Sequence, residues 1–275
     1  MNEIMQNIIA ARDYIQARAQ TKPQIAIILG SGLGGLADDV AVEAAFPYGD
    51  LPNFPVSTVV GHAGQLALGT LAGKNVVVMQ GRFHYYEGYP MTQVVFPVWV
   101  MQALGAETLI VTNAAGGLDP VFDPGDVMLI SDHINMMGDN PLRGPNLDDL
   151  GPRFPDMTNA YDPALRDLVL RVAATQNIPV QQGTYTGWAG PTFETKAERR
   201  FLRLIGGDAV GMSTVPEVIA ANHAGMRVMG MSAITNKATG SANQQPDDHT
   251  HVLAMAKVAG EKLVRLLRSV IQEMT

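Results

Sequence analysis

Residues 25–36 read Ile25-Ala-Ile-Ile-Leu-Gly-Ser-Gly-Leu-Gly-Gly-Leu36, a short apolar run that continues directly into a glycine-rich turn. An apolar run of this length that ends in glycine is typical of a buried strand. The backbone N–H groups of such a turn, together with the hydroxyl group of Ser31, can hold a phosphate group. The stretch therefore predicts a strand that opens into a binding loop, and this pattern recurs along the chain.

Further β-rich runs predict strands at residues 76–79, 109–112, 127–130 and 228–235. Helical spacing predicts helices at residues 92–104, 163–174, 195–204 and 215–223, within residues 1–20, and over residues 253–274. Strands that alternate with helices favour an α/β architecture with a largely parallel sheet covered by helices. No linker separates two patterned halves, so we expect a single domain over residues 1–275.

The composition excludes several classes of protein. The chain has 47% hydrophobic and 16% charged residues, enough apolar material for one large core, and it contains no cysteine for a disulfide, a thiolate metal site or a nucleophile. Its formal net charge of −7 argues against a broad surface for nucleic acid or anionic membranes. No apolar run reaches the roughly 18 residues of a membrane-spanning helix. We therefore expect a cytoplasmic protein.

Two segments lack a helical or strand pattern. Residues 136–158 are rich in Pro, Gly, Asn and Asp and are predicted to form a long loop. Residues 238–250 are polar and precede the last predicted helix. Long loops in compact domains are usually functional or mobile, so we interpret residues 238–250 as a candidate lid segment.

The run Gln80-Gly-Arg-Phe-His-Tyr-Tyr-Glu-Gly-Tyr follows the strand predicted at residues 76–79. Arg82 offers a planar fork of donors for an oxyanion. His84 lies two residues later, and this spacing puts both side chains on one face if the backbone is extended. Each residue alone fits a surface ion pair or a structural histidine better. Both together at a strand end favour an anion site.

Other motifs also stand where predicted strands end. Thr112-Asn-Ala-Ala-Gly-Gly fits either tight packing or the close approach of a ligand. Within residues 189–195, Phe193 supplies an aromatic face and Glu194 an acceptor for a purine edge, although spacing alone favours a carboxylate in a helix first turn. Ser213 could donate to phosphate and Asn236 to a ring nitrogen, because open α/β sheets place ligands at such strand ends.

Three alternative chemistries are disfavoured. Gly30, Gly32 and Gly35 match a dinucleotide fingerprint, but the acid at residue 43 comes too soon for an intervening helix. Ser213 lacks the second glycine of a nucleophile elbow. The histidines show no zinc-binding motif. A dinucleotide-dependent oxidoreductase and a non-catalytic nucleoside-binding protein remain the alternatives from other classes.

The chain resembles the trimeric, low-molecular-mass purine nucleoside phosphorylases over nearly its whole length. The resemblance rests on the motifs ILGSGLG, GHAG, GRFHYYEGY, TNAAGG, DHIN, NPLRGPN, RFPDM, GPTFET, VGMSTVPE and ITNK, which occur in this order. It implies a single α/β domain with a twisted mixed sheet, a homotrimer, and inorganic phosphate as a co-substrate without any cofactor.

The resemblance also implies roles for individual residues. The phosphate ligands would be Ser31, His62, Arg82, His84, Ser213 and the backbone N–H of Ala114. The purine would meet Glu194, Asn236 and Phe193, and the ribose would lie near Tyr86, Met212 and His249.

Two of these assignments involve segments that vary or cross between subunits. Either His249 or His251 could reach the ribose, and we choose His249 because the following Val252-Leu253 aligns without a gap. Phe154 is expected to enter the active site of a neighbouring subunit, so that assembly would complete the site.

The reaction implied is cleavage of purine (deoxy)ribonucleosides by phosphate to the free base and (deoxy)ribose 1-phosphate, a step of purine salvage. His84, Glu194 and Asn236 are the expected catalytic residues. A carboxylate suits the N1–H of a 6-oxopurine, whereas adenine presents a bare acceptor there. Inosine and guanosine are therefore the expected substrates, and methylthioadenosine or xanthosine is the alternative.

Overall fold

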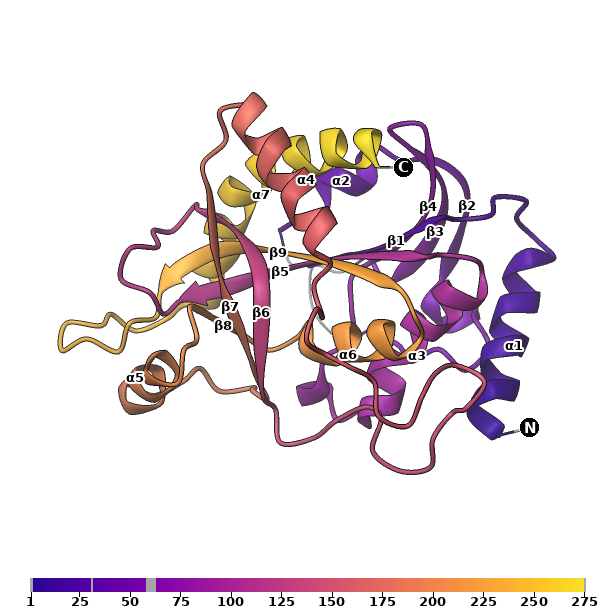
Figure 1. The fold of residues 1–275 in the computed structure, drawn as a ribbon, viewed down its shortest axis with the longest axis horizontal. Helices are drawn as coiled ribbons and strands as arrows, with labels where there is room; N and C mark the ends of the chain where they lie inside the picture. Colours follow the sequence, from indigo (N-terminus) through magenta and orange to yellow (C-terminus); the bar gives the residue numbers. More distant parts are fainter. Residues whose placement is uncertain (1, 31, 58–62, 275) are drawn as a thin grey trace.

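The computed structural model describes residues 2–30, 32–57 and 63–274. It shows a mixed β-sheet flanked by helices (Figure 1). The strands are β1 (Ile25–Leu29), β2 (Ala41–Pro47), β3 (Gln65–Leu71), β4 (Lys74–Gln80), β5 (Thr108–Gly117), β6 (Val127–Met136), β7 (Val180–Trp188), β8 (Ala209–Gly211) and β9 (Arg227–Lys237). The helices are α1 (Glu3–Gln16), α2 (Gly35–Asp38), α3 (Met91–Ala103), α4 (Pro163–Thr175), α5 (Lys196–Leu204), α6 (Val215–His223) and α7 (His249–Glu273), with 3-10 turns η1 (Tyr48–Asp50) and η2 (Tyr85–Glu87).

The strand order is β2-β3-β4-β1-β5-β8-β7-β6-β9, and β9 also pairs with β5. Strands β5, β9, β6, β7 and β8 therefore close into a ring. The neighbouring strands β4, β1, β5 and β9 run parallel to one another, while β5–β8 and β6–β9 are antiparallel. Parallel strands bring their carboxyl ends to one edge, where open α/β sheets bind ligands.

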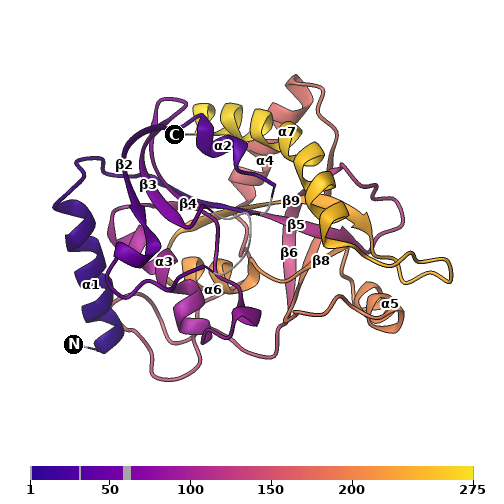
Figure 2. The same cartoon turned by 180° about the vertical axis from the view of Figure 1, so that it is seen from behind.

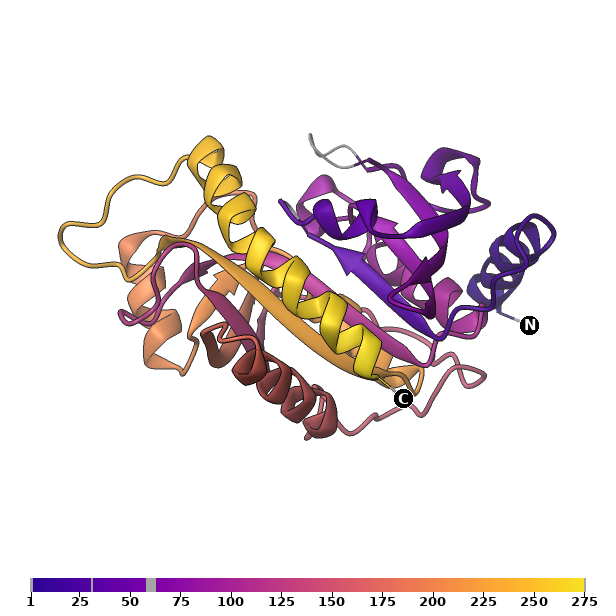
Figure 3. The same cartoon turned by 90° about the horizontal axis from the view of Figure 1, so that it is seen from above.

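Helices cover both faces of the sheet. Helix α7 lies along one face beside α4 and α2, and α3 and α6 lie on the other (Figures 1 and 3). Alternation along β1 explains how one strand serves both sides: Ile25, Ile27 and Leu29 join the core under α4 and α7, whereas Ala26 and Ile28 join the core with α1, α3 and α6. Because both faces are buried, the strand reads as a continuous apolar run.

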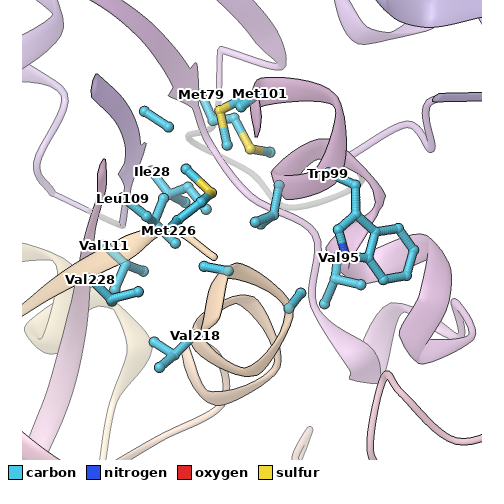
Figure 4. Close-up of a cluster of buried hydrophobic side chains, with 14 of the residues drawn as sticks. Ile28, Met79, Val95, Trp99, Met101, Leu109, Val111, Val218, Met226 and Val228 are labelled. Carbon is cyan, nitrogen blue, oxygen red and sulfur yellow. The ribbon is translucent and has the colours of Figure 1, made fainter. Parts of the chain in front are cut away.

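The larger core packs strand side chains against α3 and α6, as Figure 4 shows. The labelled strand residues there include Ile28, Leu109, Val111 and Val228, and the labelled helix residues include Val95, Trp99 and Val218. Large side chains such as Trp99 each bury substantial apolar area, so this core anchors β1, β5 and β9 from one side.

Local chemistry explains where two helices near the ligand edge begin. Thr195 accepts from the N–H of Glu198 while the Glu198 carboxylate accepts from the N–H of Thr195, so a capping box starts α5. Asp162 caps α4, and Pro163 occupies the first turn of that helix, where its missing N–H costs nothing. Glu194 precedes the cap of α5, so the alternative of a first-turn carboxylate is wrong.

The predicted α/β class and the mixed sheet flanked by helices are confirmed. All five predicted strands and all six predicted helices exist, and residues 137–162 form the long loop. The sequence did not predict β2, β3, β7 or β8. Strand β2 is largely exposed, Gly69 and Thr70 interrupt the apolar residues of β3, β7 carries polar residues, and β8 spans three residues. No described helix is both long and apolar enough to span a membrane.

Candidate active site

A cavity of about 340 Å³ lies at the carboxyl ends of β4, β5, β8 and β9. A volume of this size suits a small organic ligand. The predicted site residues that line it are Arg82, His84, Tyr86, Ala114, Phe193, Glu194, Met212, Ser213 and Asn236. Segments from both halves of the chain therefore meet in one cavity, as the anion motif and the purine motif together required.

The remaining predicted site residues lie elsewhere or are not described. Ser31 and His62 lie outside the described residues. His249 begins α7, and the structure does not describe its side chain or that of His251. Phe154 lies on the long loop after β6, where its side chain is 88% exposed and does not line the cavity.

Arg82 is fixed by contacts to distant segments. Its Nε donates to Oε1 of Glu217 at 2.9 Å, and its Nη1 donates to the carbonyl of Thr112 at 2.5 Å. Both side chains of the ion pair are almost fully buried, at 2% and 3% exposure. The guanidinium thus reaches the cavity in one orientation, which suits a planar fork that binds an oxyanion.

His84 is held beside Arg82 at the start of η2. Its Nδ1 lies 3.2 Å from Oε1 of Glu87, and its ring stacks on Tyr86 with 4.7 Å between the ring centroids. Burial lowers the pKa of His84 below its ordinary value of 6.5, although the hydrogen bond with Glu87 opposes the change. Burial thus favours the neutral ring, whereas the contact with Glu87 favours the protonated ring, in which both nitrogens donate.

Ser213 is presented by a strained turn at the start of α6. Thr214 has φ 74° and ψ −52°, and the N–H of Val215 donates to the carbonyl of Ser213 at 2.8 Å, which makes a γ-turn. The side chain of Asn113 donates to Oγ1 of Thr214 at 2.9 Å and supports this conformation. Strain of this kind costs about 1–3 kcal/mol and is concentrated at functional sites.

A glycine allows β5 and β9 to approach each other inside the cavity. Gly116 pairs with Asn236 just after a shift in the strand register. A Cβ atom at Gly116 would lie 2.9 Å from the Cβ of Ala238 and 3.4 Å from the amide of Asn236. The glycine in this motif thus serves the close approach of two strands that carry site residues.

The other end of the cavity is rich in hydrogen-bond acceptors. Glu194 is 8% exposed, and its Oε2 lies 3.4 Å from Nε of Arg199. Burial raises the pKa of Glu194 above its ordinary value of 4.5, while the charge of Arg199 opposes that rise. Asn236 accepts from Oγ1 of Thr235 at 2.9 Å, and Phe193 supplies an aromatic face, 42% exposed.

The sequence did not predict Glu217, Arg199 and Asp247 as parts of the site. Glu217 stands inside the motif VGMSTVPE, but nothing in the motif shows that it pairs with Arg82. Arg199 is one of two adjacent arginines and Asp247 one of two adjacent aspartates. Only tertiary contacts distinguish the buried member of each pair. Among residues 2–30, 32–57 and 63–274, no group of three or more His, Cys, Asp or Glu side chains could hold a metal ion.

Comparisons with known proteins fit this geometry. The model of the phosphorylase superfamily matches residues 24–272. Purine nucleoside phosphorylase 1 of Bacillus subtilis is 55% identical over 263 residues, which cover 96% of this chain and 97% of that protein. The chain belongs to the purine nucleoside phosphorylases.

Solved structures of this purine nucleoside phosphorylase family agree with the fold. The enzyme of Schistosoma mansoni in complex with inosine has a TM-score of 0.94 and 41% sequence identity, covering 98% of this chain and 97% of that one. A Schistosoma mansoni purine nucleoside phosphorylase in complex with adenosine gives a TM-score of 0.93 with 42% identity, covering 98% of both chains. A purine nucleoside phosphorylase must hold an oxyanion and a flat heterocycle around one sugar carbon. The cavity brings Arg82 and His84 together with Glu194 and Asn236.

Proposed function

We propose that this chain cleaves purine nucleosides with inorganic phosphate and prefers 6-oxopurines such as inosine and guanosine. One observation carries the proposal: Arg82 and His84 share a single cavity with Glu194 and Asn236. An anion and a base held at these two ends would place a sugar carbon between them. No cofactor enters the reaction, and phosphate is the second substrate.

In the proposed reaction the bond between C1′ and N9 breaks, and its electron pair stays with the base. The ribose becomes cationic and a phosphate oxygen attacks C1′ from the opposite side. The base takes up one proton at N7 and the attacking hydrogen phosphate gives one up, so the products are the neutral base and ribose 1-phosphate. Charge separates in the transition state, and groups that bind more strongly as charge develops accelerate the step. Phosphate would stabilise the sugar, while Asn236 would accept from the N7–H that forms on the leaving base and Glu194 from its N1–H.

The phosphate end combines charge with fixed donors. We assign phosphate binding to Arg82, His84, Ser213 and the backbone N–H of Ala114, together with Ser31 and His62. Burial and the contact with Glu217 orient Arg82, and the γ-turn at Thr214 orients Ser213. Ser213 also precedes the N-terminus of α6, where the helix dipole favours an anion.

The base end supports the preference for 6-oxopurines. An ionised Glu194 only accepts hydrogen bonds, so it matches the N1–H of hypoxanthine or guanine and not the bare N1 of adenine. Because related Schistosoma mansoni enzymes were solved with adenosine as well as inosine, we place the preference in the rate of turnover. Methylthioadenosine and xanthosine are the alternative substrates. Tyr86, Met212 and His249 would contact the ribose.

The exposed Phe154 supports a homotrimer. A phenylalanine that is 88% exposed leaves a large apolar surface in water, which a neighbouring subunit could cover. We propose that Phe154 enters the cavity of the adjacent subunit near the ribose. We also propose one domain for residues 1–275, because one sheet takes its strands from the first third of the chain to β9.

We expect inosine to be converted to hypoxanthine only when phosphate is supplied. The reason is that the proposed phosphate ligands would position phosphate, and not water, as the nucleophile. Release of hypoxanthine, followed by ultraviolet absorbance with and without phosphate, measures the dependence. Equal cleavage in phosphate-free buffer would contradict the proposal, and a nicotinamide signal would favour an oxidoreductase.

We expect kcat/KM for inosine to fall as the pH is lowered, because protonated Glu194 loses the charge that strengthens its hydrogen bond from N1–H. Burial raises the pKa of Glu194, so the fall should begin at a higher pH than the ordinary value of 4.5 would give. The pH profile of the Glu194→Gln variant provides the comparison, because its amide does not titrate. Identical acid limbs in both proteins would show that another group controls the profile.

A further inference from the structure

The lid segment, residues 238–250, lies against the basic residues of α5 (Figure 2). Nζ of Lys196 donates to the carbonyl of Ala242, and Nη1 of Arg200 donates to the carbonyl of Gly240, both at 2.8 Å. These are contacts to backbone atoms and need no particular lid side chain. The contact between Arg199 and Asp247 is different, because it joins two buried side chains.

Arg199 holds two carboxylates from different segments. Its Nε lies 3.4 Å from Oε2 of Glu194, and its Nη2 forms an ion pair with Oδ2 of Asp247. The three side chains are 3%, 4% and 7% exposed. A guanidinium can serve both acceptors because its donors point in fixed, separate directions. Without Arg199, two like charges would lie close together in a buried place.

Asp247 also contacts the residue expected to bind N7 of the base. Its Oδ1 accepts from Nδ2 of Asn236 at 2.7 Å. A carboxylate paired with a guanidinium only accepts hydrogen bonds, so it must face the amide nitrogen of Asn236. The amide oxygen then points the other way, where Thr235 donates to one of its two lone pairs. The second lone pair can accept from a ring N–H, so Asn236 offers the base an acceptor and not the donor expected from the sequence.

We propose that Asp247, held by Arg199, is a positioning residue that orients the Asn236 amide with its oxygen toward the base. The inference rests on the proposed function and adds a role for the lid segment. Through Asp247, the lid segment would select which atom of Asn236 meets the purine. Base recognition by Asn236 then depends on the contact between the lid segment and α5.

A double-mutant cycle tests this proposal. We expect Asp247→Ala to lower kcat/KM for inosine about tenfold to a hundredfold, a usual range for directly coupled residues. Asn236→Ala should lower it further. In the double variant the second substitution should add nothing, because an amide that is absent cannot be oriented. Losses that multiply in the double variant would show that Asp247 only staples the lid segment, and would overturn the proposal.

Two further variants control for folding. Gln245→Ala removes an exposed side chain from the same segment and should turn over inosine like the unmodified protein. Asp247→Asn keeps the size of the side chain, and its amide can face Asn236 with either atom. If the Asp247→Ala variant has a lower melting temperature than the unmodified protein, Asp247→Asn replaces it in the same cycle, with the same two outcomes.

Calorimetric binding of hypoxanthine to the four proteins gives the cycle without turnover. This measurement separates the two possible failures. An unmodified protein that does not cleave inosine with phosphate would refute the proposed function. Active protein with independent effects of Asp247 and Asn236, in both rate and binding, would refute only the role of Asp247.

Discussion

Asn236→Ala is expected to lower kcat for inosine about 10²–10³-fold, the usual effect of removing one group that stabilises charge in a transition state. Asn236 would accept from the N7–H that forms on the base as the bond to the sugar breaks, so this contact strengthens in the transition state. An interaction made mainly in the transition state lowers kcat and kcat/KM together and leaves KM nearly unchanged. Glu194→Ala should have an effect of the same order, because it removes the acceptor at N1–H.

Steady-state kinetics with saturating phosphate measure the effect of Asn236→Ala, and thermal melting checks the fold. Lys237→Ala is the matched control, since Lys237 is the next residue and its ion pair with Asp123 is solvent-exposed. Exposed pairs of this kind contribute about 0–1 kcal/mol. If Asn236→Ala loses melting temperature and activity in proportion, Asn236 is a structural residue.

Arg82→Met is expected to lower the free energy of unfolding by about 3–5 kcal/mol, because it leaves the buried charge of Glu217 without its partner. The Oε2 atom of Glu217 is already buried without a hydrogen-bond partner in the described part of the chain. The same variant should lose phosphate-dependent cleavage. Replacing both partners, in Arg82→Met with Glu217→Met, should restore most of the stability and none of the activity.

This pattern separates the structural task of Arg82 from its chemical task. Thermal unfolding at one fixed protein concentration compares the stabilities, and inosine cleavage at increasing phosphate compares the activities. Arg203→Met is the control, because the Arg203 side chain is 39% exposed and should cost much less stability. A double variant that regains activity would show that Arg82 does not bind phosphate.

The parts of the fold that follow local rules were predictable. The buried strand at residues 25–29 and the amphipathic C-terminal helix show their periodicity directly, and the capping box of Thr195 and Glu198 starts α5 where helical spacing begins. Strand β7 was missed because its first part carries the polar residues Gln181 and Gln182, which are only partly buried or exposed. A pattern method has little contrast to use in such a strand.

The candidate site was predictable where a motif ends a strand and less so where partners meet across the fold. Arg82 and His84 could be predicted as site residues because they follow directly after β4. Glu217 does not, because its partner is 135 residues away. Asp247 and Asp248 look equivalent in sequence, but it is Asp247 that forms the buried ion pair with Arg199. Such choices depend on packing, which one sequence does not display.

The pairing of β5 with β9 also determines when the site can form during synthesis on the ribosome. Ala114 of β5 pairs with Ala233 of β9, and Gly116 pairs with Asn236, so the two strands that carry site residues come from distant parts of the chain. After β5 has emerged from the ribosome, most of the remaining helices and strands must be synthesised before β9 emerges. Until then the chain cannot bind a nucleoside. Nucleoside in the cell can therefore stabilise only fully synthesised molecules against proteolysis.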